Sequence, residues 1–246
     1  MSRPRSLADT ASYLLDLGFE EVRRGRPEDP APAAGAPPVE PDVPPAATAL
    51  AAAAAGESVD ALFARLSAEV ASCRRCRLCE GRNRTVFGDG DPRARLMFVG
   101  EGPGAEEDRT GLPFVGRAGE LLTKIIQAIQ LERQQVYIAN IVKCRPPGNR
   151  EPQPDEVAAC RGYLEAQIDA IRPRVLVALG RVAAQTLLGN DTPIGKMRGQ
   201  WFEVRGVPVM VTYHPAALLR NPSLKRPTWD DLQQVRDRLA ATDGES

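Results

Sequence analysis

Five cysteines are the residues whose spacing points most directly to chemistry. Cys73 and Cys76 form a closely spaced pair, Cys79 follows three residues later, and Cys144 and Cys160 come much further along the chain. Clustered thiols of this kind, odd in number, are more typical of metal ligation in a reducing compartment than of a disulfide scaffold. Four thiolates suit either a zinc ion or an iron–sulfur cluster, so the spacing predicts a metal site without choosing between the two.

His214 is the only histidine in the chain, so any imidazole chemistry has to use it. It follows the last predicted strand and precedes Pro215, Leu218, Leu219 and Arg220, and we expect both leucines to be exposed. A lone histidine is most often a structural residue. A proline-bounded loop at the end of a strand nevertheless favours a functional role, which makes His214 a candidate site residue.

Two further candidate segments also follow predicted strands. Gly100–Gly104 places three glycines where the chain must turn tightly, which allows a ligand to approach the backbone, although a purely structural turn is the commoner explanation. The segment has neither a dinucleotide-binding fingerprint nor the lysine of a P-loop. Asn140 ends the next strand, and its amide can donate to and accept from the edge of a pyrimidine, with a buried structural asparagine as the alternative.

The elements that must position these residues alternate between strand and helix. Hydrophobic periodicity and helix-start signals predict helices over residues 59–71, 118–129, 154–171, 182–188 and 229–241. Strands are predicted over residues 96–99, 136–142, 175–179, 201–204 and 207–212. This order predicts an α/β fold, a three-layer α/β/α sandwich around a mostly parallel central sheet, in which ligands usually bind beyond the carboxyl ends of the strands.

The chain is predicted to have three parts: residues 1–25 with a short N-terminal helix, residues 26–58 as a disordered Pro/Ala-rich linker, and residues 59–246 as the main domain. The linker has too few large apolar side chains to offset the entropy of ordering. The helix before it is either a frayed terminus or a peptide that docks a protein partner.

Charge and hydropathy limit the classes of protein. The first 60 residues have five Arg, no Lys and ten acidic residues, a net charge of −5, so the remainder of the formally neutral chain has +5. A mildly basic domain is compatible with binding a phosphate backbone. No apolar run is long enough to cross a membrane and no signal peptide is visible, so we expect a soluble, cytoplasmic protein that does not engage a membrane.

Taken together, these segments resemble the family-4 uracil-DNA glycosylases, the iron–sulfur branch of the uracil-DNA glycosylase superfamily. The resemblance runs from about Cys73 to Leu239 and leaves out residues 1–58. It is carried by Cys73-Arg-Arg-Cys76-Arg-Leu78, Gly100-Glu-Gly-Pro-Gly104, Gly111-Leu-Pro-Phe-Val-Gly-Arg-Ala-Gly119, Asn140-Ile-Val-Lys-Cys144-Arg-Pro-Pro and His214-Pro-Ala-Ala-Leu-Leu-Arg220.

The resemblance implies a base-excision repair enzyme that flips uracil out of DNA and hydrolyses its N-glycosidic bond, leaving an abasic site. Phe114 would stack on the uracil, Asn140 would read its pairing edge, and Glu101 and Gly102 would line the same pocket. His214 would donate a hydrogen bond to the departing base. Catalysis would thus depend on His214, Asn140 and Glu101, with Gly102 and Phe114 binding the substrate.

Two more groups of residues receive roles from the resemblance. A wedge of Leu218, Leu219 and Arg220 would occupy the space that the flipped base leaves in the DNA. A structural [4Fe-4S] cluster would be bound by Cys73, Cys76, Cys144 and Cys160. Cys79 would then be a spare thiol, or a ligand in an alternative assignment.

One departure bears on mechanism, because the best-known uracil-DNA glycosylases have an aspartate where this chain has Gly102. The adjacent Glu101 either orients the attacking water or fixes the loop, and stabilisation of the leaving group should dominate. The rival hypotheses are a relative that stays trapped on uracil-containing DNA and a non-catalytic iron–sulfur or zinc module of a repair or replication complex. The expected partners are uracil-containing DNA and a protein for the N-terminal helix, and a monomer is expected.

Overall fold

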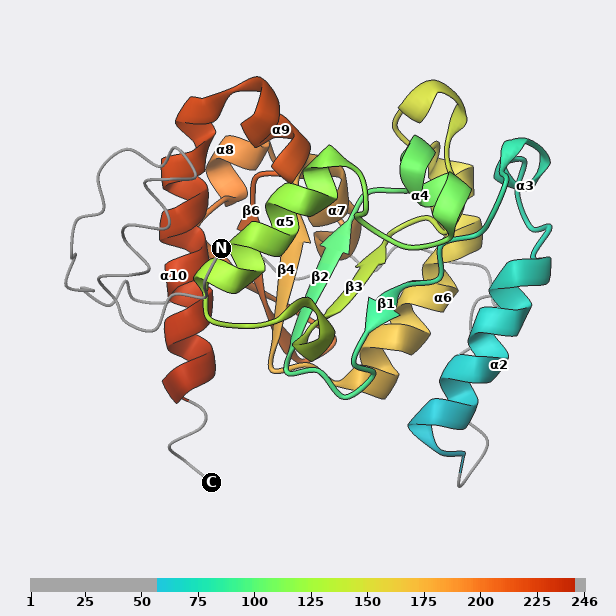
Figure 1. The fold of residues 1–246 in the computed structure, drawn as a ribbon, viewed down its shortest axis with the longest axis horizontal. Coiled ribbons are helices and arrows are strands. Elements are labelled where there is room, and N and C mark those ends of the chain that lie inside the picture. Colours follow the sequence, from blue (N-terminus) through green and yellow to red (C-terminus); the bar gives the residue numbers. More distant parts are fainter. Residues whose placement is uncertain (1–56, 242–246) are drawn as a thin grey trace.

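The structure is a computed structural model that describes residues 57–241, so the predicted N-terminal helix and most of the linker lie outside the described residues. Within this range the chain forms one six-stranded sheet in the order β1-β3-β2-β4-β6-β5, with helices on both faces (Figure 1). The strands are β1 Asp89–Gly90, β2 Leu96–Gly100, β3 Tyr137–Asn140, β4 Val175–Leu179, β5 Trp201–Val204 and β6 Val207–Thr212.

The longer helices pack against the sheet, and shorter ones lie in its connections. The α-helices are α2 Val59–Ser72, α3 Leu78–Gly81, α4 Ala105–Thr110, α5 Arg117–Ala128, α6 Pro154–Ile171, α7 Arg181–Leu188, α8 Ile194–Met197, α9 Pro215–Arg220 and α10 Lys225–Ala241. Short 3-10 turns lie at Arg133–Gln135, Pro147–Asn149 and Pro222–Leu224. The predicted helix over residues 229–241 begins earlier, because Pro227 falls in the first turn, where no backbone N–H is needed.

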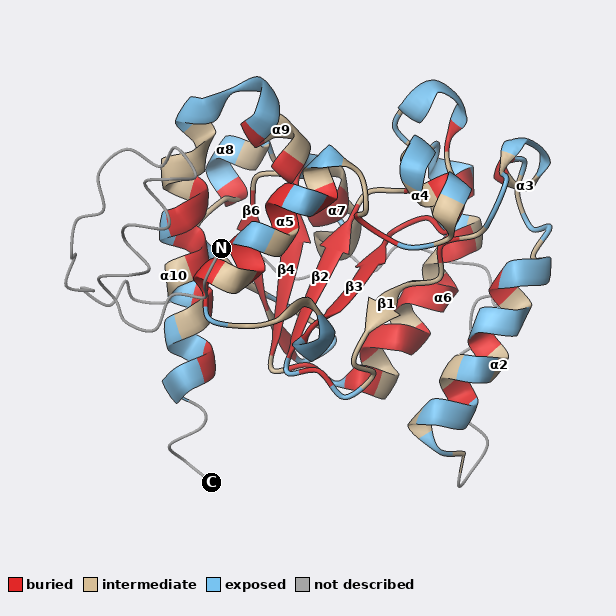
Figure 2. Ribbon diagram, in the orientation of Figure 1, coloured by how far each residue is buried: buried red, intermediate tan, exposed pale blue. Residues whose placement is uncertain are grey.

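Alternating side chains of the strands divide the core between the two faces of the sheet. Met97 and Val99 of β2 join the side chains of α2, α6 and α7 on one face, whereas Leu96 and Phe98 join those of α5, α9 and α10 on the other. This is the two-residue period of a strand buried on both sides. Figure 2 shows β2, β3 and β4 buried throughout and the helices buried on their inner sides. The predicted three-layer α/β fold is therefore confirmed.

The parallel strands bring their carboxyl ends to one edge of the sheet. β3, β2, β4 and β6 run parallel, and the antiparallel β1 and β5 close the two sides. Gly100 at the end of β2 pairs with Asn140 at the end of β3. The predicted strand over residues 136–142 is shorter in the structure, because after Asn140 the chain instead follows the glycine loop, with Ile141 N–H donating to Gly100 O at 2.9 Å.

No helix among residues 57–241 is both long enough and apolar enough to cross a lipid bilayer.

Candidate active site

A cavity of about 700 Å³ opens at the carboxyl ends of the parallel strands. Its walls come from the glycine loop after β2, the segment that leads into α5, the end of β3, the loop before α6 and the start of α9. The sequence-predicted residues that the structure brings together around it are Glu101, Gly102, Phe114, Asn140, His214 and Arg220. Leu218 and Leu219 do not line it.

Asn140 and Phe114 meet at Gly100. A Cβ atom on Gly100 would lie 2.5 Å from both Asn140 Oδ1 and Phe114 Cζ, so only glycine leaves room for the two side chains. Asn140 is 1% exposed, and its Oδ1 has no hydrogen-bond partner among the described residues. A buried oxygen without a partner destabilises a fold, so this geometry is that of an acceptor available to the N–H of a ligand.

His214 places its ring in the same cavity and also caps α9. Its Nδ1 accepts a hydrogen bond from Ala216 N–H at 3.1 Å, which assigns the proton of the neutral imidazole to Nε2. The ring centroid lies 5.5 Å from that of Phe114, at an interplanar angle of 32°. Burial, with the positive charge of Arg220, lowers the pKa of His214 to about 4. At neutral pH the imidazole is therefore an uncharged donor through Nε2.

Glu101 and Gly102 form the wall that follows β2. Burial, followed by the negative charge of Glu151, raises the pKa of the Glu101 carboxyl above its usual value, and Arg181 partly opposes this rise. A Cβ atom at Gly102 would approach Val142 Cγ2 to 2.9 Å. A carboxylate at position 102 would thus require Val142 to move, which leaves Glu101 as the acidic residue of this loop.

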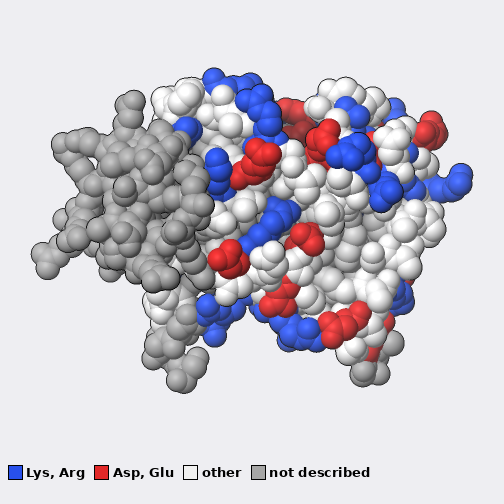
Figure 3. Space-filling model, in the orientation of Figure 1, with Lys and Arg blue, Asp and Glu red and all other residues white. Residues whose placement is uncertain are grey.

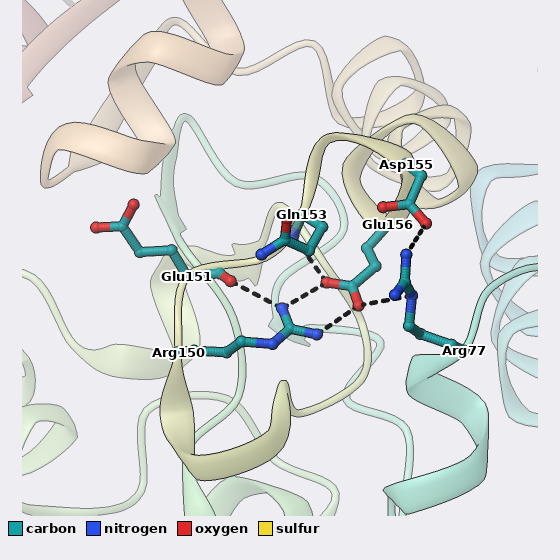
Figure 4. A network of polar contacts seen from close by, with 6 residues as sticks. All are labelled: Arg77, Arg150, Glu151, Gln153, Asp155 and Glu156. Atoms are coloured by element: carbon teal, nitrogen blue, oxygen red, sulfur yellow. Dashed lines mark hydrogen bonds and ion pairs between the residues drawn. The ribbon is translucent and has the colours of Figure 1, made fainter.

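A buried carboxylate holds the loop that forms another wall of the cavity (Figure 4). Glu156 Oε1 and Oε2 accept hydrogen bonds from the two terminal nitrogens of Arg150 at 2.6 and 2.8 Å, and Oε2 also accepts from Gln153 N–H at 2.7 Å. Arg77, next to Cys76, lies 3.6 Å from Glu156 and pairs with Asp155 at 2.7 Å. The bond to Arg150 lowers the pKa of Glu156, so this ionised residue links the cavity wall to the cysteine segment.

The α9 segment corrects one prediction, and the start of α5 adds a cavity residue that the sequence did not single out. Leu218 is 0% exposed and packs in the core beneath α9, so the prediction that it is exposed is wrong; Leu219 is 40% exposed. The cause is helical, because Pro215 and Leu218, three residues apart, face inward. Arg117, at the start of α5, lines the cavity together with Arg220. Both arginines are exposed, and neither forms an ion pair with a described residue.

The five cysteines surround a second, smaller cavity that shares no lining residue with the first. Arg82 Nη1 donates to Cys144 Sγ at 3.2 Å, and Lys143 N–H donates to Cys160 Sγ at 3.2 Å. Within residues 57–241, no three His, Cys, Asp or Glu side chains are arranged to hold a metal ion. The convergence of the thiols agrees with the sequence pattern, and the identity of their ligand stays a prediction.

The fold and the first cavity define an α/β protein that offers an aromatic ring, an amide and a neutral imidazole to a planar heterocycle. Residues 87–233 match the model of the uracil DNA glycosylase superfamily. The type-4 uracil-DNA glycosylase of Sulfurisphaera tokodaii is 46% identical over 187 residues, 72% of this chain and 84% of the relative. That of Thermotoga maritima is 46% identical over 175 residues, 70% of this chain and 91% of the relative.

A type-5 uracil-DNA glycosylase of Pyrobaculum aerophilum is more distant, at 36% identity over 173 residues, 63% of this chain and 75% of the relative. The chain therefore belongs to the uracil-DNA glycosylase superfamily and, within it, to the type-4 family. The resemblance drawn from its motifs is confirmed.

Proposed function

We propose that this protein is a DNA-repair glycosylase that hydrolyses the N-glycosidic bond of uracil in DNA, releasing free uracil and leaving an abasic site. Membership of the type-4 family supports this activity. The structural observation that carries it is the buried, unpartnered Oδ1 of Asn140 in the same cavity as Phe114 and His214. A module that only tethers a repair complex has no need of such a pocket.

Asn140 and Phe114 provide recognition of the base. The pairing edge of uracil presents an N–H donor between two carbonyl acceptors, which an amide matches by accepting through Oδ1 and donating through Nδ2. Cytosine presents an acceptor nitrogen at the same place, so its binding would leave buried polar groups unpaired. The ring of Phe114 contributes stacking of about 1–3 kcal/mol without distinguishing bases, so discrimination against cytosine depends on Asn140. Thymine has the same pairing edge as uracil, so the tightness of the pocket must exclude its extra methyl group.

His214 acts on the leaving group. Breaking the glycosidic bond leaves the electron pair on uracil while the sugar becomes cation-like. A donor aimed at a uracil oxygen in a buried site lowers the barrier to this charge separation. His214 Nε2 supplies that donor without carrying a charge, since its pKa is about 4. Water then adds its hydroxyl to the sugar carbon, its proton balances the uracil anion, and the Glu101 carboxylate orients the water.

The exposed residues around the cavity bind the DNA. Leu219 of α9 enters the space that the flipped base leaves, while Arg220 and Arg117 contact phosphates from two different helices. Figure 3 shows acidic and basic side chains interspersed over the visible, described part of one face, without a single continuous basic patch. We therefore expect Arg220 and Arg117, which line the cavity, to contribute to the affinity for the phosphate backbone.

Cys73, Cys76, Cys144 and Cys160 are proposed to bind a [4Fe-4S] cluster. All five thiols line one small cavity, so thiolates from separate segments of the chain can reach one cluster there. The N–H groups that donate to the sulfurs of Cys144 and Cys160 also suit thiolates. When bound, the cluster would supply iron–thiolate bonds that join distant segments of the chain, a structural role.

A labelled oligonucleotide with one uracil, incubated with enzyme in excess and then treated with alkali, tests the activity. The native protein should cleave every strand, and His214→Ala should slow excision at least about tenfold, or ~1.4 kcal/mol. His214→Asn is the sharper variant, because asparagine is a good N-cap for α9 but lacks Nε2. Unbroken strands with the native protein would reject the glycosylase, and a native rate in His214→Asn would reject His214 as the donor.

A further inference from the structure

Phe114 has a backbone conformation that bulky residues rarely adopt. Its φ angle is +50°, in the left-handed region, where a side chain with a Cβ atom is disfavoured. In this conformation the ring reaches Gly100 and lies beside His214, and the residue is only 7% exposed. Such a conformation persists only where the surroundings enforce it, so the contacts of the neighbouring backbone should show what holds Phe114 in place.

The peptide unit between Phe114 and Val115 is held at both of its polar groups. Arg133 Nη1 donates to Phe114 O at 3.2 Å, and Arg133 Nη2 donates to Pro113 O. On the other side, Glu107 Oε1 accepts from Val115 N–H at 2.8 Å. Because a peptide unit is planar, fixing its carbonyl and its N–H fixes its orientation and therefore the ψ angle of Phe114. A cation and an anion thus hold one peptide from opposite ends.

Glu107 also joins two loops that line the cavity, the glycine loop after β2 and the segment that leads into α5. Its Oε1 accepts a second hydrogen bond from Gly116 N–H at 2.9 Å, and its Oε2 accepts from Gly104 N–H, in the glycine loop, at 3.1 Å. A carboxylate that accepts several backbone N–H groups forms strong, charge-assisted bonds. On the far side, a Cβ atom at Gly119 would lie 1.9 Å from Phe114 O, so only glycine permits α5 to approach this peptide.

We propose that Glu107 and Arg133 are positioning residues that clamp the Phe114–Val115 peptide and thereby set the Phe114 ring against the base. The proposal rests on the stacking role of Phe114 given above. Glu107 lines the cavity, but both of its carboxylate oxygens already accept backbone hydrogen bonds, three in all, whereas Arg133 does not line the cavity. Arg133 therefore acts through Phe114 alone, and the hydrogen bonds of Glu107 are directed at the backbone that holds Phe114.

A double-mutant cycle tests this coupling with single-turnover excision rates at enzyme excess. Glu107→Ala and Arg133→Gln should each lower the rate about tenfold, because small displacements of a positioned group are costly to catalysis. In a Phe114→Ala background the same changes should cost less than about twofold, because the ring that they position is gone. Glu107→Gln keeps one acceptor oxygen for Val115 and Gly116, so its rate should lie between those of the native protein and Glu107→Ala.

Glu120→Gln is the matched control, since it removes an exposed carboxylate from the first turn of α5 and should leave the rate unchanged. Thermal melting should show that each variant is folded at the assay temperature. If Glu107→Ala is not folded, Arg133→Gln alone tests the clamp. If Glu107→Ala and Arg133→Gln lower the excision rate by the same factor in the native and Phe114→Ala backgrounds, and Phe114→Ala is itself slow, the clamp is overturned while the stacking role of Phe114 stands. An unimpaired Phe114→Ala would overturn both.

Discussion

The pKa of His214 can be measured without ambiguity, because the chain has one histidine. The structure lowers this pKa from 6.5 to about 4, first through burial, which disfavours the imidazolium, and then through repulsion from Arg220. At about 1.4 kcal/mol per pKa unit, the folded protein favours the neutral ring by about 3 kcal/mol. This contribution to stability is fully present above pH 6.5 and is lost as the pH falls from 6.5 towards 4.

The assay is an NMR titration of the imidazole. With a pKa of about 4, roughly 97% of the ring is neutral at pH 5.5, whereas an unperturbed ring would be only about 9% neutral. Long-range proton–nitrogen correlations should find the proton on Nε2, because Nδ1 accepts from Ala216 N–H. Arg220→Gln should raise the midpoint by removing a positive charge, yet leave it below 6.5, because burial is the larger cause.

Excision rates offer a second measurement of the same group. With a pKa of about 4, the His214 ring stays almost entirely neutral between pH 7.5 and 5.5. If the neutral ring is the donor, the excision rate should therefore not fall over this range through protonation of His214. Glu101 also lines the cavity, and burial raises the pKa of its carboxyl, so its protonation could also lower the excision rate in acid. A loss of rate is assigned to His214 only if its midpoint coincides with the midpoint of the NMR titration. A midpoint near 6.5, or a rate that rises as the ring becomes charged, would refute the neutral donor.

Two further predictions concern the DNA contacts and the cysteines. Arg117→Gln and Arg220→Gln should each reduce the slope of log affinity against log salt concentration by about one. Lys124→Gln, an equal charge change further along α5, should leave the slope unchanged. Equal slopes in all three variants would contradict the phosphate contacts. The purified protein should be brown, with broad absorbance near ~400 nm, and Cys160→Ser should lose iron and melt at a lower temperature than Cys79→Ser. A colourless protein loaded with zinc would exclude the cluster.

Local patterns predicted the elements that have strong signals of their own. The helix Pro154–Ile171 agrees with its prediction, because proline and two acidic residues mark its first turn and the strand Val175–Leu179 follows closely. The α9 helix was not predicted, because six residues are too few to show a helical period against a background of proline and alanine. The same gap explains the error at Leu218, whose burial follows from the helix.

The candidate residues were found because each stands at the end of a strand or in a recognisable segment, whereas the contacts that hold them were not. Arg133 donates to carbonyl groups 19 and 20 residues earlier in the chain. Every residue has a backbone carbonyl group, so the sequence does not indicate which of them accepts such a bond. The positive φ of Phe114 is equally invisible, because phenylalanine is not a residue that marks such a turn. Gly119 was the one available signal, since a glycine inside a helix often indicates close packing.

The acidic residues around the cavity obey one electrostatic requirement. Both the DNA backbone and the departing uracil are anionic, so an unpaired carboxylate beside them would oppose binding and catalysis. Glu107 and Glu156 avoid this conflict, because backbone N–H groups and, at Glu156, a guanidinium surround their oxygens. Among residues 57–241, no N–H or guanidinium group donates a hydrogen bond to Glu101, and its raised pKa shows the cost of its position, which Arg181 only partly offsets. The cation-like sugar is the one participant in the reaction whose charge would offset that cost, which favours placing Glu101 on the side of the sugar and its attacking water.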